Sequence, residues 1–215
     1  MDSLLMQFCI VLLSLTTFGM HVVKKNYSVV AMYGLQSSAI VGLLLISFHE
    51  QRSLSLLLVA LVTLVVKVIM APTFFSRLLK RHKLKFAVST YASTPLTLII
   101  ITGIIMLANS AIFAPLITVA PAAHSHIILS ISMMLISIFL MVNRKGALSQ
   151  VIGVLSLENS IVAFAIFAGL EQSAVLQVGI LFDIFVWSNI AIVLVSMVYR
   201  HVGSLDTTSM RELQD

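Results

Sequence analysis

Long apolar runs separated by short clusters of charged residues make up the whole chain, and this alternation restricts the folds open to it. Each run is roughly 20 residues long, which is the length that an α-helix needs to cross the hydrocarbon core of a bilayer. Of the 215 residues, 60% are hydrophobic and only 10% are charged. Soluble globular chains do not have this composition. The sequence therefore predicts an all-α, polytopic integral membrane protein with a single membrane domain and no soluble catalytic domain.

Seven membrane spans are predicted from the apolar runs. They cover residues 3–23, 28–48, 53–76, 89–113, 124–143, 147–170 and 173–199. The single membrane domain then has five helices in residues 1–143, two more in residues 144–200 and a tail in residues 201–215. Pro72 and Pro95 lie within or at the start of the third and fourth spans, where we expect them to bend or break the helix.

The basic residues are distributed unevenly between the two ends of these spans. Eleven of the 13 lysines and arginines fall on one face if there are seven spans: Lys24, Lys25, Arg77, Lys80, Arg81, Lys83, Lys85, Arg144, Lys145, Arg200 and Arg211. Arg52 lies on the other face and Lys67 lies inside a span. Because basic loops stay in the cytoplasm, the pattern predicts an external N-terminus and a cytoplasmic C-terminus. One span more or fewer would scatter the basic residues over both faces.

Charge and cysteine content exclude several other functions. The formal net charge of +5 comes from clusters that lie between apolar runs, so it favours a membrane topology signal over nucleic-acid binding. Cys9 is the only cysteine, so this chain alone builds no disulfide framework and no thiolate metal or iron–sulfur site. We expect no cofactor here, and any redox chemistry must belong to a partner. The first run has no basic residue before it, which favours a retained helix over a signal peptide.

Three ionisable residues lie deep inside the predicted spans: Lys67, Glu158 and Asp183. A charge at the centre of a bilayer costs about 2.5 to 3.5 kcal/mol on insertion scales, so three such residues indicate a polar path or an ion pair. At 1.5 Å per residue, both carboxylates lie about 18 to 20 Å from the turn between the last two spans. We therefore expect the three residues to form one lateral polar layer, which acts either as a proton relay or as a static ion pair.

Other polar residues in the spans are candidates for support of that layer. Asn159 follows Glu158 directly, and Gln36 lies in the second span as a hydrogen-bonding residue. His124 and His126 begin the fifth span, but two positions on a helix point about 200° apart, so a bis-histidine haem site is improbable. We expect these histidines at the interface or at a water-accessible end of the layer.

Several short segments resemble component E of hydrogenase-4, a membrane subunit of formate hydrogenlyase-like, energy-converting hydrogenases. The matching segments are Tyr33-Gly34-Leu35-Gln36-Ser37, Lys67 with Pro72, Gln150-Val151-Ile152-Gly153, Glu158-Asn159, Gly179 with Asp183, and Gly203-Ser204-Leu205-Asp206. The last three helices, from residue 124 onward, are also similar to subunit K of respiratory complex I and to the C subunit of multisubunit cation/proton antiporters.

This resemblance implies a place in a larger complex of the inner (plasma) membrane. The implied partners are antiporter-like large membrane subunits and the membrane anchor of a nickel–iron hydrogenase-type arm. The chain itself would be no enzyme, and Glu158 would belong to a lateral proton-translocation path. One position departs from the pattern: Gln177 stands two residues before Gly179, where the family leads us to expect an acidic residue. Asp183 is then the remaining acidic candidate in that helix.

Three alternative functions are compatible with parts of the sequence. A subunit of a cation/proton antiporter without a redox arm would need the same buried charges. A structural membrane scaffold would not need three of them. A seven-helix retinal protein would have an external N-terminus and a buried lysine, but that family has its lysine in the last helix, and Lys67 is in the third. The proton-path subunit therefore explains the buried charges best.

Overall fold

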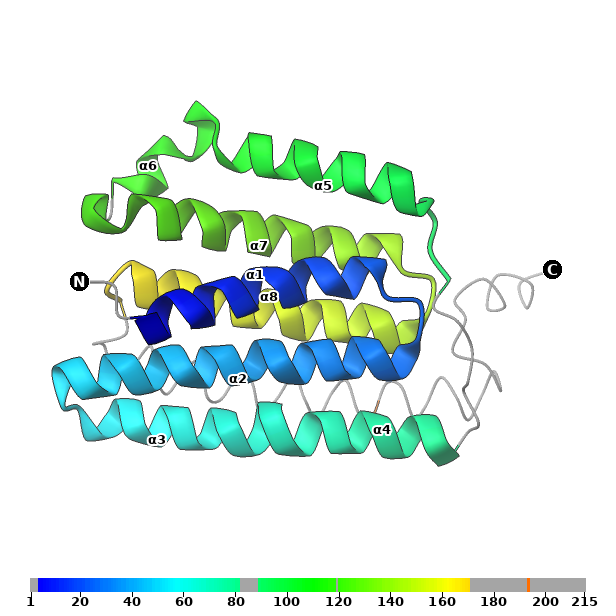
Figure 1. Ribbon diagram of the computed structural model, residues 1–215, viewed down its shortest axis with the longest axis horizontal. Coiled ribbons are helices and arrows are strands. Elements are labelled where there is room, and N and C mark those ends of the chain that lie inside the picture. The colour runs from blue at the N-terminus through cyan, green and yellow to red at the C-terminus, as the bar shows by residue number, and fades with distance from the viewer. Residues whose placement is uncertain (1–3, 82–88, 119, 171–192, 194–215) are drawn as a thin grey trace.

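The computed structural model describes residues 4–81, 89–118, 120–170 and 193, and every regular element in these ranges is a helix (Figure 1). The long elements are α1 (Leu4–Val22), α2 (Asn26–Gln51), α3 (Leu54–Thr63), the π-helix η1 (Leu64–Met70), α4 (Ala71–Arg81), α5 (Thr94–Ala108), α7 (His124–Asn143) and α8 (Ala147–Phe167). Short helical turns lie between α5 and α7: η2 (Ala111–Phe113), α6 (Ala114–Ile117) and η3 (Pro121–Ala123). The prediction of an all-helical chain is confirmed for the described residues.

Five helical segments are long enough and apolar enough to cross a membrane, and they correspond to five of the predicted spans. They cover Leu4–Val22, Asn26–Gln51, Leu54–Arg77, Pro121–Asn143 and Ala147–Phe167. This length and composition are those of a helical membrane protein. The predicted seventh span, 173–199, lies outside the described residues, as do Gln177 and Asp183.

The predicted fourth span, 89–113, is wrong in its extent. The helix at this place, α5, has 15 residues and begins only at Thr94, with Pro95 in its first turn. Residues before it are not helical because they bond to the end of α7 and to the connection that follows it. The N–H of Tyr91 donates to the Asn143 carbonyl at 3.0 Å, and the N–H of Lys145 donates to the Ser89 carbonyl at 3.1 Å. Proline lacks an N–H and has a fixed φ, so it suits the first turn of a helix. Pro95 thus begins α5 and does not bend it.

The third span stays helical through Pro72, but it changes its hydrogen-bond pattern just before that residue. Leu64–Met70 form a π-helix, and the N–H of Ala71 bonds to the carbonyl of Val66 five residues back. A proline inside a helix removes one N–H and crowds the preceding turn, and a π-turn is one way in which a helix absorbs such a defect. The expected local break at Pro72 is therefore a widened turn that carries Lys67.

The helices pack as an antiparallel bundle in which α2 lies centrally. It contacts α1 on one side, the segment from α3 to α4 on another, and α8 as well, while α7 packs along α8 and α5 packs on α7 at the edge (Figure 1). The α7–α8 contact is close because Gly153 faces the backbone of Met141, and a Cβ there would lie 2.7 Å from Met141 Cγ. Apolar residues of α7 and α8 also pack in the same buried clusters as residues of α1 and α2.

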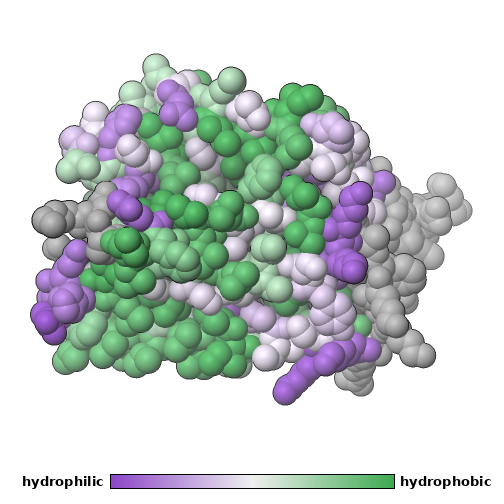
Figure 2. All heavy atoms as spheres, in the orientation of Figure 1, coloured by the Kyte–Doolittle hydropathy of each residue, from purple (hydrophilic) through white to green (hydrophobic). Residues whose placement is uncertain are grey.

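Two apolar clusters fill the two ends of the bundle. We call the cluster at the end of the bundle that holds the α2–α3 turn the outer cluster. It includes Leu13, Ile40, Val59, Ile131 and Phe167. The inner cluster, at the end that holds the α1–α2 and α7–α8 connections, includes Met20, Val30, Phe75, Leu140 and Ile152. In Figure 2, an apolar belt lies between hydrophilic residues at the two ends of the molecule. Buried polar side chains gather between the clusters.

Candidate functional site

Lys67 lies in the middle of the third span and is completely buried. It belongs to the π-helix η1, whose residues Val65, Ile69 and Met70 are exposed on the outer surface of the bundle. The lysine side chain points the other way, between the helices. Because π-turns are rare and concentrate at functional sites, a buried charge on such a turn marks this position as a candidate site.

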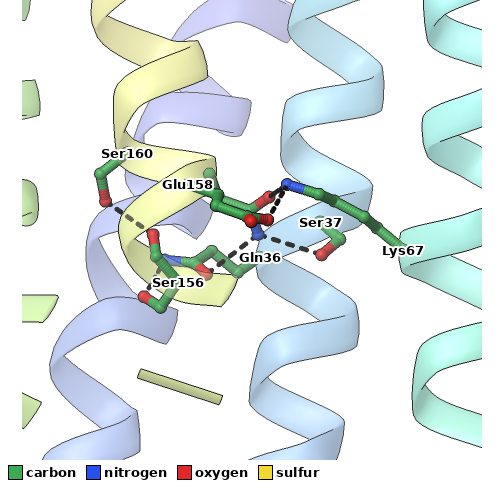
Figure 3. A network of polar contacts seen from close by, with 7 residues as sticks. Gln36, Ser37, Lys67, Ser156, Glu158 and Ser160 are labelled. Atoms are coloured by element: carbon green, nitrogen blue, oxygen red, sulfur yellow. Dashed lines mark hydrogen bonds and ion pairs between the residues drawn. The ribbon is translucent and has the colours of Figure 1, made fainter. Parts of the chain in front are cut away.

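The ammonium group of Lys67 contacts two consecutive residues of α8, Glu158 and Asn159. Lys67 Nζ is 3.2 Å from Glu158 Oε2 and donates to Asn159 Oδ1 at 3.0 Å. Figure 3 shows the lysine crossing from its helix to the carboxylate on α8. The Glu158 residue is 8% exposed, so the whole pair is withdrawn from water. The prediction that Lys67 and Glu158 lie in one lateral layer agrees with this contact.

A buried ion pair of this kind is costly to assemble and costly to break. Each charge loses several kcal/mol of hydration when it leaves water, and the attraction between the charges repays this loss only with good geometry and further hydrogen bonds. Removal of one partner leaves an uncompensated charge, which costs about 3 to 5 kcal/mol. The two groups therefore have strongly coupled charge states, since a proton gained or lost by one changes the energy of the other.

Asn159 connects the ion pair to α2. Its Nδ2 donates to Gln36 Oε1 at 3.1 Å and to Ser37 Oγ at 3.0 Å. Gln36 is completely buried and continues the network, because its Nε2 donates to Thr17 Oγ1 on α1 at 2.8 Å and to Ser156 Oγ on α8 at 2.9 Å. The expectation that Gln36 is an interhelical hydrogen-bond partner agrees with these contacts, and Asn159, expected to support the layer, belongs to it.

The network also reaches α7. Ser156 Oγ is 2.9 Å from Ser137 Oγ on α7, and both serines are completely buried. We call the connected set the polar layer. Its members come from α1, α2, η1, α7 and α8: Thr17, Gln36, Ser37, Lys67, Ser137, Ser156, Glu158 and Asn159. The polar layer links the buried Lys67–Glu158 pair to hydrogen-bonding groups on α1, α2 and α7.

His124 and His126 do not lie in the polar layer. His124 is exposed at the start of α7, and the ring of His126 stacks on Phe167 with ring centroids 5.1 Å apart. From His126 to Ser137, where α7 meets the layer, is a rise of about 16 Å along the helix. The histidines therefore lie at the beginning of α7, as the interfacial alternative expected, and this placement does not fit the other alternative, that they support the layer. Within the described ranges, no three His, Cys, Asp or Glu side chains group together as metal ligands.

Sequence reasoning missed two basic side chains near the inner end of the bundle. His21, on α1, is buried with its Nε2 3.1 Å from the carbonyl oxygen of Ile136 and its ring stacked on Phe139. Arg144, counted above only as a basic loop residue, is 1% exposed. Its position directly after α7 gave no sign that it is buried, because interfacial arginines usually extend to water.

Arg144 closes the end of α1. The last carbonyl groups of a helix have no partner within that helix. The Nη2 of Arg144 donates to the carbonyl oxygen of Met20 and, at 3.2 Å, to that of Val23. Burial lowers the pKa of the guanidinium from its ordinary value of 12.5 to about 10. The group still carries its charge at neutral pH and serves as a cap that ties α1 to the α7–α8 connection.

Comparison with known proteins gives one distant relative. The chain is 24% identical over 193 residues to a Mycobacterium tuberculosis protein described as uncharacterized protein Rv0085, and the match covers 87% of this chain and 86% of the relative. No family model matches the chain. No solved structure matches it. The comparisons thus show similarity to one uncharacterized protein along most of its length, and function must be argued from the polar layer.

Proposed function

We propose that this chain is a non-catalytic membrane subunit that contributes the Lys67–Glu158 pair to a lateral proton path, coupled to redox chemistry in a partner arm of an energy-converting complex. The single observation that carries the proposal is a buried lysine–carboxylate pair, 3.2 Å apart, near the middle of the membrane spans. A static pair needs hydrogen bonds to its own charged groups, but it does not need a network that extends from Lys67 through two amides to α1 and α7. Such a network is appropriate where the charge of the pair changes during function.

The coupling of the two charges suggests how the pair passes a proton. In the resting pair, the Lys67 ammonium and the Glu158 carboxylate have no net charge. A proton taken up by the carboxylate gives the neutral acid and leaves one positive charge in a region of low dielectric constant. That excess charge favours release of a proton to the next acceptor in the membrane plane. Asp183, which lies outside the described residues, is the candidate acceptor in the predicted seventh span.

The resemblance to hydrogenase-4 component E supports the choice of complex. It supplies the proposed partners, which are antiporter-like large membrane subunits and the membrane anchor of a nickel–iron hydrogenase-type arm in the inner membrane. The proposed topology has seven spans, an external N-terminus and a cytoplasmic C-terminus. An antiporter subunit without a redox arm uses the same pair, and mass spectrometry of the purified complex separates the two, since only the first brings hydrogenase-type subunits with it.

Glu158→Gln tests the proposal. The substitution keeps the size of the side chain and most of its hydrogen bonding but removes the titratable proton. We expect the complex to assemble, substrate turnover in its redox arm to continue, and proton uptake into proteoliposomes to fall at least tenfold. Glu50→Gln is the matched control, because Glu50 is an exposed carboxylate at the end of α2 and the same substitution there should leave uptake unchanged. Wild-type uptake by the Glu158→Gln complex would refute the proposal.

Asp183→Asn extends the test to the predicted seventh span. If the proton passes from Glu158 to Asp183, loss of either titratable group interrupts the path, and the two variants should have the same phenotype. Gln177→Glu should be tolerated or slightly activating, because it restores the acidic group that the family resemblance leads us to expect. Normal uptake in Asp183→Asn with low uptake in Glu158→Gln would remove Asp183 from the path and leave Glu158 in it.

A further inference from the structure

The two amide side chains of the polar layer have a fixed orientation that starts at Lys67. A lysine ammonium only donates hydrogen bonds, so the atom of Asn159 that lies 3.0 Å from Lys67 Nζ must be the oxygen. Its Nδ2 then faces α2 and donates to Gln36, so the Gln36 atom at 3.1 Å must be Oε1. The orientation of both amides therefore follows from the charge of the lysine.

The same logic fixes the direction of the bonds that reach α1 and return to α2 and α8. With Oε1 facing Asn159, the Nε2 of Gln36 donates to Thr17 at 2.8 Å and to Ser156 at 2.9 Å. The Asn159 Nδ2 uses its second hydrogen on Ser37 at 3.0 Å. All four amide hydrogens are thus used, and both amide oxygens accept. In each of the bonds from Lys67 through the two amides, the donor is the group nearer to the ammonium, so this chain of hydrogen bonds is polarised in one direction.

We propose that Gln36 and Asn159 are positioning residues that stabilise the charged form of Lys67 and transmit its charge state to hydroxyl groups on α1 and α7. The inference rests on the proposed function, because it gives the network a part in the proton path. If Lys67 loses its proton, the neutral amine can accept from Asn159 Nδ2. Both amides then turn over, Gln36 Oε1 faces Thr17, and the Thr17 hydroxyl must become the donor.

Thr17 opposes that reversal because its hydroxyl hydrogen is already used in a bond to another acceptor. Thr17 Oγ1 donates to the carbonyl of Leu13 at 2.8 Å while it accepts from Gln36. In the reversed chain it must give up the bond to Leu13. Thr17, which contacts neither Lys67 nor Glu158 in this network, therefore favours the charged form of Lys67. Removal of the Thr17 hydroxyl should make loss of the Lys67 proton easier.

Thr17→Val is the direct test, and Thr16→Val is its matched control. Valine has the shape of threonine without the hydroxyl. Thr16 is adjacent and equally buried, but its hydroxyl bonds only to the carbonyls of Leu12 and Leu13. The readout is proton uptake by the reconstituted complex as a function of pH. None of these variants changes another ionisable group on the elements that form the layer. Those groups are Cys9 and His21 on α1, Tyr27, Tyr33, His49 and Glu50 on α2, Arg77, Lys80 and Arg81 on α4, His124 and His126 on α7, and Glu158 on α8.

We expect Thr17→Val to move the alkaline limb of the uptake profile to lower pH by about half a unit to one unit, as the loss of one hydrogen-bond acceptor in the chain would do. Thr16→Val should leave the limb in place, and Thr17→Ser should restore it. If Thr17→Val does not assemble, Ser137→Ala with Ser130→Ala as its control provides the same comparison on α7, because Ser130 bonds only to the Ile127 carbonyl.

Parallel measurements on Glu158→Gln separate the two proposals. Superimposed profiles for Thr17→Val and Thr16→Val, together with low uptake in Glu158→Gln, would overturn only the role of the amides. Wild-type uptake in Glu158→Gln would overturn the proton path itself. A shifted limb in Thr17→Val alone, with rescue by serine, would support the polarised chain, since a purely structural role of Thr17 changes the amount of assembled complex but not its pH dependence.

Discussion

The guanidinium of Arg144, on the connection between α7 and α8, donates to the carbonyl oxygen of Met20 in the last turn of α1. The two residues are far apart in the chain, and this contact fixes the inner end of α1 against the second half of the bundle. A charged donor on an unpaired helix carbonyl is worth more than a neutral one, typically about 1.5 to 3 kcal/mol. The contact is therefore a substantial part of the stability of that end.

Replacement of Arg144 by methionine should lower the free energy of unfolding by about 2 to 4 kcal/mol, because the carbonyl groups of Met20 and Val23 lose their charged donor. Arg144→Lys should recover only part of this, since an ammonium lacks the planar fork of the guanidinium. Thermal unfolding of the purified chain in detergent measures both. Lys145→Met is the control, because Lys145 stacks over the Tyr91 ring at a partly exposed site.

The contribution of Arg144 should not depend on pH between 6 and 9. Burial lowers the folded-state pKa to about 10, so the guanidinium is charged in both folded and unfolded chains over that range. Because the guanidinium keeps its proton in both states over this range, unfolding neither binds nor releases a proton at Arg144, and its contribution to the slope of stability against pH is zero. Unfolding temperatures of wild type and Arg144→Met compared across pH 6 to 9 check this, and a difference that varies within the range would contradict it.

Gly153→Ala should force α7 and α8 apart. A Cβ at this position would lie 2.7 Å from Met141 Cγ and 3.1 Å from the Met141 backbone nitrogen, so a change in side-chain rotamer alone cannot make room. We expect a loss of about 1 to 3 kcal/mol in unfolding free energy, as for other overpacked contacts. Gly103→Ala on α5 is the control, because no atom lies within 4 Å of its Cβ and alanine favours the helix. Equal unfolding temperatures for the two variants would contradict the close α7–α8 contact.

The ion pair allows a separation of stability from function. Lys67→Met alone leaves Glu158 without its lysine, and the assembled complex should lose about 3 to 5 kcal/mol of stability. The double variant Lys67→Met, Glu158→Leu removes both charges and should recover most of that loss. If the pair belongs to a proton path, proton uptake should stay low in the double variant although assembly returns. Recovery of both assembly and uptake would identify a static pair.

Membrane topology provides the broadest test of the proposed arrangement. A reporter protein inserted after Thr118 should be external, and one fused after Asp215 should be cytoplasmic, because the basic residues collect at the other end of the spans from Thr118. A cytoplasmic reporter at Thr118 would reverse the proposed orientation. External reporters at both Thr118 and Asp215 would require an even number of spans between these two residues, where three are proposed.

Much of the helical architecture follows from hydropathy because a backbone in hydrocarbon must satisfy its own hydrogen bonds. The apolar runs therefore located five of the spans within a few residues. The start of α5 did not follow, since Tyr91 bonds to the last residue of α7 and Ser89 to the α7–α8 connection, and such long-range contacts leave no trace in local composition. The π-turn at Lys67 was also not predicted, although Pro72 indicated that the hydrogen-bond pattern of this helix would be interrupted nearby.

The site was predictable where charge was involved and unpredictable where hydroxyl groups were. The cost of a buried charge identified Lys67 and Glu158, and their depths along the helices placed them at one level. Nothing in the sequence distinguishes Thr17 from its neighbour Thr16. Both bond to carbonyls of their own helix, as serine and threonine in membrane helices commonly do, and only packing against Gln36 gives one of them a place in the network.

The two apolar clusters determine how the pair would experience an electric field. A membrane voltage falls mainly across regions of low dielectric constant, and here these lie above and below the polar layer. One charge that crosses the whole membrane changes energy by about 2.3 kcal/mol per 100 mV, so a proton that reaches the layer from either surface has done about half of that work. The polar layer then lies about halfway through the voltage drop. The membrane voltage should therefore act both on the steps that bring a proton to the layer and on the steps that release it.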